Sequence, residues 1–223
     1  MQITGLIFFG DSVFSGAGTS NRQYGCAKIV KNSLNIDVSI RGKHRYTSKK
    51  ALEGMFDGVL LRKEYSHVVV IFGNNDSWFN QYGKPRIDLE NFEKNMTTIV
   101  SSIRDNGQML ALCNLQPIDA KKFLNHFPQY VEICKKNRIE PFLWHKNYNG
   151  VIEKISKLLN VPLIDIRSQL ERLNVDVVAD DGLHPNDSGH RIIADSILAT
   201  LCRIDKTLQV STRYKNNAQV IMD

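Results

Sequence analysis

Long apolar runs are absent from this chain, and so are the cysteine spacings that bind metals. No stretch reaches the roughly 18 apolar residues that a membrane-spanning helix needs. A basic region ahead of the first apolar stretch is also missing, so no signal peptide is indicated and we expect a cytoplasmic location. The cysteines lie far apart with no Cys-x-x-Cys pair, which argues against zinc and favours free thiols at Cys26, Cys113, Cys134 and Cys202.

A concentrated patch of one charge is missing too, although basic residues outnumber acidic ones. The net charge is +6, and the densest basic clusters, 43–50 and 135–138, are typical of solvated faces. Basic and aromatic residues do not interleave in any nucleic-acid-binding pattern, so we expect no nucleic-acid partner. With 42% hydrophobic residues in 223, the composition suits one α/β domain with a sizeable core.

Segments typical of strands and of helices alternate along the chain. This alternation predicts a three-layer α/β/α fold with a mainly parallel five-stranded sheet. We assign it to a single domain over 1–205. Within the helix expected at 47–61, Phe56 is predicted to face inward. The strands are expected at 3–9, 36–40, 67–72, 109–114 and 161–166, and the helices at 24–34, 47–61, 88–106, 147–159 and 187–201.

Two segments do not follow this alternation. Between 116 and 146 aromatic and charged residues are mixed without a clear period. A segment of this length is either a cap over an active site or a plain surface insertion, and both interpretations stay open. The last residues, 206–223, are largely polar and are expected to form a C-terminal tail.

Two short motifs follow directly after expected strands, at the edge where open parallel sheets bind ligands. In Gly10-Asp11-Ser12 the serine hydroxyl is a candidate nucleophile, provided that a base takes its proton. In Gly73-Asn74-Asn75-Asp76 the side-chain amide of Asn75 is a candidate donor to an oxyanion. Each motif alone also has a plainer interpretation, because Ser12 is a good helix N-cap and the asparagine motif is rich in turn residues.

A third motif, Asp181-Gly182-Leu183-His184-Pro185, comes just before the last expected helix. The Asp181 carboxylate can fold back onto the His184 ring and fix its tautomer, which leaves the other ring nitrogen free to act as a base. His190 competes for this role, since Asp187 stands three residues before it. That pair falls inside the expected helix, where it more simply makes a first-turn contact, so we favour His184.

The three motifs together, in this order, resemble the SGNH (GDSL-type) hydrolase family over nearly the whole chain, about 3–201. The glycine that ends Ser39-Ile40-Arg41-Gly42 matches a further family position. The resemblance implies a flavodoxin-like fold and ester hydrolysis through an acyl-enzyme, with no cofactor or metal. A Gly-x-Ser-x-Gly motif is lacking, which argues against the α/β-hydrolase fold. The implied catalytic residues are Ser12, Asp181 and His184, and the implied oxyanion hole consists of Ser12, Gly42 and Asn75.

The expected substrate is a small-molecule, glycan or lipid ester with an acetyl or short acyl group. Trp78 and Phe79 follow Asn75 and either line its pocket or pack under a loop. Lys43 and Arg45, which follow Gly42, suggest selection of an anionic substrate. Two other functions stay open from the sequence: an O-acyltransferase that uses the same residues, and a silent binding module with the same fold.

Overall fold

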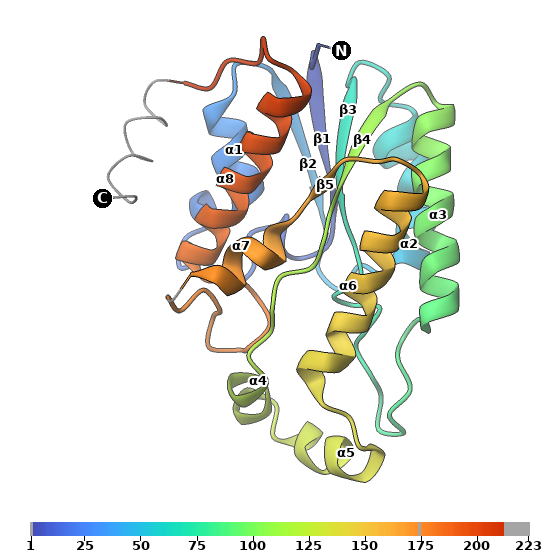
Figure 1. Ribbon diagram of the computed structural model, residues 1–223, viewed down its shortest axis with the longest axis vertical. Coiled ribbons are helices and arrows are strands. Elements are labelled where there is room, and N and C mark those ends of the chain that lie inside the picture. Colours follow the sequence, from blue (N-terminus) through green and yellow to red (C-terminus); the bar gives the residue numbers. More distant parts are fainter. Residues whose placement is uncertain (1, 174, 212–223) are drawn as a thin grey trace.

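A computed structural model describes residues 2–173 and 175–211 and shows one twisted sheet between two layers of helices (Figure 1). The five strands are all paired in parallel, in the order β2-β1-β3-β4-β5. This is the flavodoxin-like order, and it confirms the predicted fold class. The strands are β1 (Gly5–Gly10), β2 (Asp37–Gly42), β3 (His67–Ile71), β4 (Met109–Cys113) and β5 (Leu163–Ile164).

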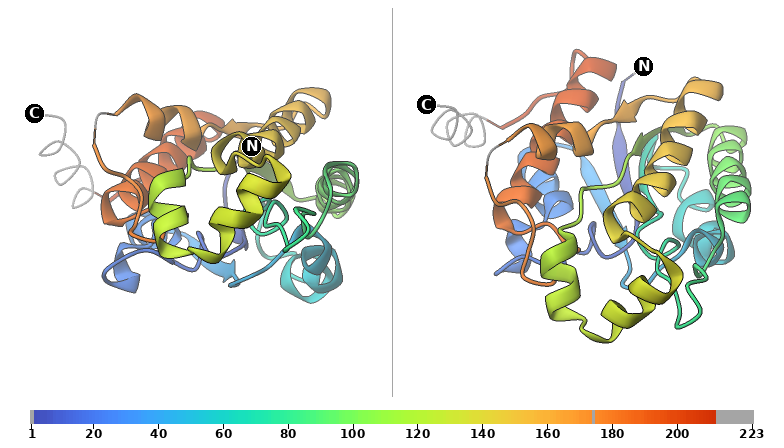
Figure 2. Two further views of the ribbon diagram at one scale, coloured as in Figure 1. Left: turned by 90° about the horizontal axis from the view of Figure 1, so that it is seen from below. Right: turned by 60° about the horizontal axis from the view of Figure 1, so that its bottom comes forward.

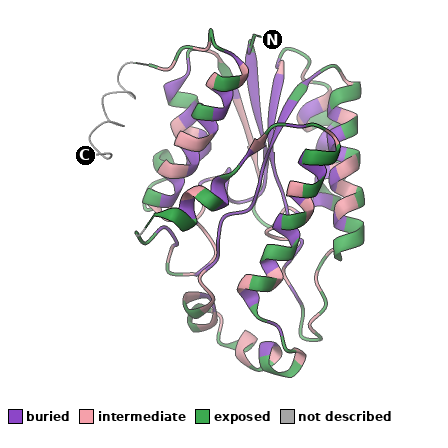
Figure 3. Ribbon diagram, viewed as in Figure 1, coloured by how far each residue is buried: buried purple, intermediate pink, exposed green. Residues whose placement is uncertain are grey.

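The central strands are buried on both faces, as their sequences require. All residues of β1 and β3 are buried, and the run Val68-Val69-Val70 in β3 is at most 1% exposed (Figure 3). Strands covered by helices on both sides need apolar residues at every position, whereas a half-exposed strand would alternate. Because the strands are parallel, their carboxyl ends share one edge of the sheet, and the three motifs follow that edge.

Six helices form the two covering layers. On one face α1 (Cys26–Ser33) and α7 (Ile166–Arg172) pack against α8 (Asp187–Ile204), and on the other α3 (Leu89–Asp105) packs between α2 (Ser48–Met55) and α6 (Pro141–Leu158). The stripe expected on this helix begins at Leu89, which is 39% exposed at the first helical position, whereas its other five apolar side chains are fully buried at helical spacing. They are Phe92, Met96, Ile99, Val100 and Ile103.

Two helices differ from their expected form. The helix expected over 47–61 is α2 followed by a π-helical turn, η2 (Phe56–Leu60). Phe56, the first residue of this turn, is 60% exposed rather than inward, because Met55 and Val59, four residues apart, occupy the buried face and Phe56 lies off it. The helix expected from 147 begins earlier, at Pro141, because the Glu140 carboxylate accepts N–H bonds from the first turn.

Residues 116–146, here called the cap segment, lie beyond the carboxyl ends of the strands (Figure 2). They contain α4 (Ala120–His126), α5 (Gln129–Asn137) and the first turn of α6. The cap segment is joined to the loop that carries His184. Asp119 donates its N–H to the Gly182 carbonyl, 2.9 Å away, and a side chain at Gly182, whose φ is +73°, would clash with the α4 backbone.

The predicted C-terminal tail is only partly described. Its first residues pack onto the domain, where Val210 forms an antiparallel bridge with Leu34 and the Ser211 N–H bonds the Ser33 carbonyl. The remainder of the expected tail, 212–223, lies outside the described residues. Cys26, Cys113, Cys134 and Cys202 all lie in the described part of the chain, and no two of them form a disulfide. In the described part of the chain no helix combines the length and apolarity needed to cross a membrane. A short 3-10 helix, η1 (Arg22–Tyr24), precedes α1.

Candidate active site

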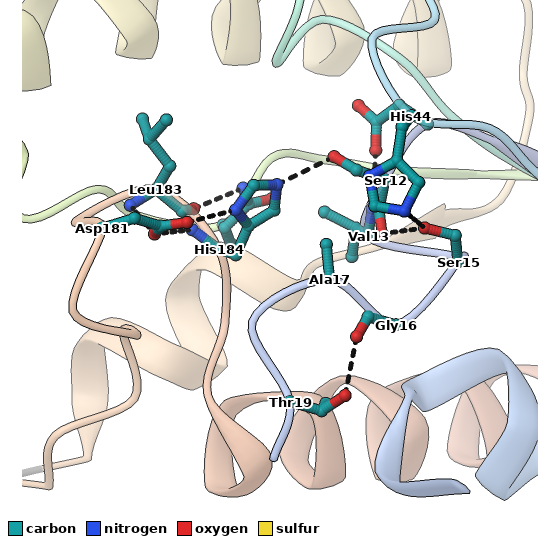
Figure 4. Close-up of polar contacts among 12 residues, drawn as sticks. Ser12, Val13, Ser15, Gly16, Ala17, Thr19, His44, Asp181, Leu183 and His184 are labelled. Carbon is teal, nitrogen blue, oxygen red and sulfur yellow. Dashed lines mark hydrogen bonds and ion pairs between the residues drawn. The ribbon is translucent and has the colours of Figure 1, made fainter. Parts of the chain in front are cut away.

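The serine and histidine motifs meet at the carboxyl edge of the sheet (Figure 4). Ser12 follows β1, and its Oγ lies 2.9 Å from Nε2 of His184, a residue 172 positions later in the chain. The other ring nitrogen, Nδ1, lies 2.5 Å from Oδ2 of Asp181. Ser12 is only 6% exposed, whereas the His184 side chain is 25% exposed. The three predicted residues therefore form one hydrogen-bonded line that begins in the core and ends near solvent.

The loop between Asp181 and His184 holds the carboxylate in its charged form. Oδ1 of Asp181 accepts the backbone N–H groups of Leu183 and His184, each at 2.9 Å. Burial alone would raise the pKa of this carboxyl, but the bonds from the His184 ring and backbone lower the pKa to about 2. An ionised Asp181 keeps the proton of His184 on Nδ1, so Nε2 is the nitrogen free to accept a proton from Ser12.

The competing histidine, His190, has a structural position. Its side chain is fully buried in α8, its Nδ1 accepts the N–H of Cys26 at 3.1 Å, and its Nε2 donates to the Ala17 carbonyl at 2.8 Å. Burial lowers the pKa of His190 to about 4. Both ring nitrogens are thus occupied and the ring stays neutral, which supports the preference for His184 as the partner of Ser12.

The second predicted motif places a buried amide donor on the same pocket as Ser12. Asn75 lies on the pocket described below, and its Nδ2 is buried without a hydrogen-bond partner. Buried amide donors are nearly always paired in native proteins, so an unpaired one needs an explanation. Gly42 ends β2 against the segment after Ser12, where a methyl group would lie 2.6 Å from the Phe14 carbonyl carbon. The structure thus brings together Ser12, Gly42 and Asn75.

A pocket of about 440 Å³ opens at this edge of the sheet. Ser12, His184 and Asn75 lie on its floor side, and the cap segment supplies much of the opposite wall. Trp78 donates its indole N–H to the Tyr130 hydroxyl at 2.6 Å, and Phe79 packs edge-on against the same ring. The aromatic lining residues are Trp78, Phe79, Phe123, Phe127, Tyr130 and Trp144.

The charges around the pocket are of one sign. Arg45 lines it, with a left-handed φ of 57°, and Arg86 lines it as well, with its guanidinium carbon 5.5 Å from the centre of the Trp78 ring. Lys43 is not among the lining residues, and its ammonium group lies over the Tyr46 ring at 4.8 Å. Among the described residues that line the pocket there is no aspartate or glutamate.

Sequence reasoning missed several pocket residues. The cap aromatics lie in the segment without a clear period, and Arg86 stands in a loop with no motif. His145, which lines the pocket from α6, had a detectable signal. It lies on the face of that helix that also carries Tyr148 and Ile152, so its spacing alone places it inward. Within residues 2–173 and 175–211 no cluster of three or more His, Cys, Asp or Glu side chains is arranged to hold a metal ion.

Comparisons with known proteins agree with this geometry. A curated Bacillus subtilis (strain 168) protein named uncharacterized lipoprotein YqeF is 27% identical over 72% of this chain and 69% of its own length. A lipase/acylhydrolase structure from Enterococcus faecalis aligns with a TM-score of 0.71 at 20% identity, over 93% of this chain and 98% of that one. For a catalytic mutant of Axe2, an acetylxylan esterase from Geobacillus stearothermophilus, the TM-score is 0.68 at 17% identity, over 89% and 94% of the two chains.

The sequence also matches a family model over residues 8–192, which include all three motifs. That model describes the GDSL-like lipase/acylhydrolase family. The match spans most of the chain, and the structural similarities extend over the same region. The chain therefore belongs to the GDSL-like lipase/acylhydrolase family and is an esterase by family.

Proposed function

We propose that this chain hydrolyses carboxylic esters through an acyl-enzyme on Ser12, with His184 as general base and Asp181 as its orienting partner. The observation that carries the proposal is the hydrogen-bonded line from Ser12 Oγ through the His184 ring to Asp181, open to a pocket. A serine hydroxyl is a weak nucleophile until a base within hydrogen-bond reach removes its proton. The 2.9 Å Oγ–Nε2 distance meets that requirement.

The reaction follows from where the protons lie. Ser12 Oγ attacks the ester carbonyl carbon while its proton passes to Nε2 of His184, and the carbonyl oxygen becomes an oxyanion. The backbone N–H groups of Ser12 and Gly42 and the unpaired Asn75 amide stabilise that charge. The carbon–oxygen bond to the alcohol then breaks, and His184 protonates the leaving alcohol. Water repeats the sequence on the acyl-enzyme, which releases the acid and returns the proton to Ser12.

The pocket favours an ester that carries both an apolar and an anionic group. The aromatic wall gives apolar contact, while Arg45 and Arg86 face the pocket with no carboxylate within 4.0 Å in the described part of the chain. Lys43, which the sequence grouped with Arg45, points to Tyr46 instead. We therefore assign anion selection to the two arginines and apolar contact to Trp78 and Phe79.

The first experiment compares wild type and Ser12→Ala on p-nitrophenyl esters of increasing chain length. We expect the wild type to release p-nitrophenol and the variant to lose that rate while keeping its fold by circular dichroism. Labelling of Ser12 by a fluorophosphonate, read by mass spectrometry, tests the nucleophile without a cleavable substrate. Equal rates in both proteins, or no label on Ser12, would contradict the proposal. Added alcohols that outcompete water as acyl acceptors would indicate a transferase instead.

The second experiment tests the substrate preference with a matched pair of esters. The p-nitrophenyl esters of succinic acid, as the hemiester, and of butyric acid share a chain length but differ in one carboxylate. We expect Arg45→Gln and Arg86→Gln each to lower the hemisuccinate-to-butyrate ratio of kcat/KM by about fivefold, since a partly exposed charge pair contributes ~1 kcal/mol. Lys43→Gln removes the same charge nearby and should leave the ratio unchanged. An unchanged ratio in the arginine variants would exclude this role.

A further inference from the structure

We propose that His145 is a positioning residue, which fixes the oxyanion donor Asn75 by holding its neighbour Asn74. The proposal rests on the proposed function, because it concerns the same oxyanion hole. His145 lies in the first turns of α6, at the end of the cap segment, and its side chain is only 4% exposed. It touches neither Ser12 nor His184 through any hydrogen bond in the described part of the chain.

A continuous polar chain runs from Asp11, the residue before Ser12, through α6 to α7. Asp11, which precedes Ser12, accepts the Asn74 side-chain N–H at 2.9 Å. The Asn74 side-chain carbonyl in turn lies 2.9 Å from Nε2 of His145. Nδ1 of His145 lies 3.3 Å from the Arg167 guanidinium. Arg167 is itself paired with Glu171 at 2.9 Å.

Only one arrangement of protons satisfies these contacts. Arg167 is a donor only, so Nδ1 of His145 must accept and Nε2 must carry the proton. That proton is donated to the Asn74 carbonyl, which leaves the Asn74 amide to donate to Asp11. Burial and the nearby Arg167 charge lower the pKa of His145 to about 3, so the ring stays neutral at physiological pH. The direction of each hydrogen bond is therefore fixed, and Asn74 is held in a single orientation.

Asn75 needs this support because its side-chain Nδ2 is buried with no hydrogen-bond partner among the described residues. The segment is fixed on its far side by Asp76, whose carboxylate accepts the Ser48 N–H at 2.9 Å. On its near side the Asn74–His145 bond is the matching attachment. Buried polar contacts add little net stability compared with apolar packing. Their effect here is to set the direction of a neighbouring donor, and a donor must be held within about 0.5 Å of the position from which it bonds the developing charge.

The test removes the link from either end and asks whether the effect passes through Asn75. We compare His145→Leu, which lacks the donor, with His145→Gln, whose amide N–H can reach the Nε2 position. A third variant, Asn74→Ala, breaks the same bond from the other side together with the Asn74–Asp11 bond. Each is made in the wild-type and Asn75→Ala backgrounds. His67→Leu is the control, because His67 is a buried histidine at the opposite end of β3.

We expect His145→Leu and Asn74→Ala to lower kcat about tenfold with KM unchanged, a fraction of the effect of losing a whole donor. His145→Gln should recover most of kcat. In the Asn75→Ala background both losses should shrink to less than about twofold, since residues that act through one group are not additive. His67→Leu should change stability alone.

Three results would overturn the proposal. They are equal losses in both backgrounds, no recovery in the folded glutamine variant, and an unchanged kcat in His145→Leu. If His145→Leu does not fold, Asn74→Ala gives the same comparison. Failure of the proposed function looks different. If the proposed function is wrong, Ser12→Ala retains the activity; if only the role of His145 is wrong, the activity depends on Ser12 but does not respond to the His145 variants.

Discussion

Replacing Asn75 by alanine should remove activity without removing stability. Its Nδ2 is buried with no partner, and an unpaired buried amide costs a folded protein about 1–3 kcal/mol. Deleting the amide relieves that cost and loses some packing, so we expect the free energy of unfolding to change by roughly 0 to +1 kcal/mol. The oxyanion loses one donor, so kcat should fall about 100- to 1000-fold, or roughly 2.7–4 kcal/mol of transition-state stabilisation.

The assay pairs p-nitrophenyl ester kinetics with urea unfolding followed by circular dichroism. Asn106→Ala is the matched control, because the Asn106 amide donates to the Leu60 carbonyl and to Gln108 at the opposite end of the molecule. That variant should lose about 1 kcal/mol of stability and keep its kcat. The reasoning would be refuted if Asn75→Ala were destabilised as much as the control, or if its kcat fell by less than tenfold.

Two more outcomes follow from backbone geometry and from titration. Gly18→Ala should reduce the free energy of unfolding and lower kcat at least tenfold. The reason is that φ is +92° at this position and the new methyl group would lie 2.6 Å from the His184 Cβ. Gly107→Ala, with φ of +82° but open space around it, should lose only about 1 kcal/mol and keep its rate. The pKa of His145 in the folded protein lies below its value in the unfolded chain. The stability that the neutral His145 ring contributes to the folded state is therefore fully present above pH ~6.5 and is lost on acidification. As the pH falls from about 6 to about 4, the free energy of unfolding of the wild type should therefore fall by ~1.4 kcal/mol per pH unit relative to that of His145→Gln. Urea unfolding measures this difference, and parallel pH curves for the two proteins would contradict it.

The fold was readable from the sequence because its strands and long helices have strong periods. The Val-rich run of β3 and the stripe of α3 each predict one element without competition. Elements set by local caps were harder to predict. The start of α6 depends on a single carboxylate, Glu140, and the π turn at Phe56 depends on the packing of neighbouring elements. Helices α4 and α5 are too short for periodicity to distinguish them from loops.

The residues of the candidate site also differ in how well the sequence predicted them. Ser12, Asn75 and His184 each stand in a short motif next to a predicted strand or helix, so their positions at one edge of the sheet could be predicted from the sequence. The contact between Lys43 and substrate stays a prediction, and the sequence did not indicate that the Lys43 ammonium group lies over the Tyr46 ring. Arg86 and the link from Asn74 to His145 join residues distant in sequence and need the fold itself. The cytoplasmic location stays a prediction.

The hydrogen bond between Ser12 and His184 joins positions 172 residues apart, and the Ile3 N–H bonds the Asp205 carboxylate across 202 residues. Ser12 is therefore synthesised well before His184. On the proposed mechanism, Ser12 stays inert during translation until α8 docks beside α1 and the loop that carries His184 reaches β1. Esterase activity would then report complete folding, and a chain that ends before α8 would contain Ser12 and His184 but lack the helix that holds the His184 loop against β1.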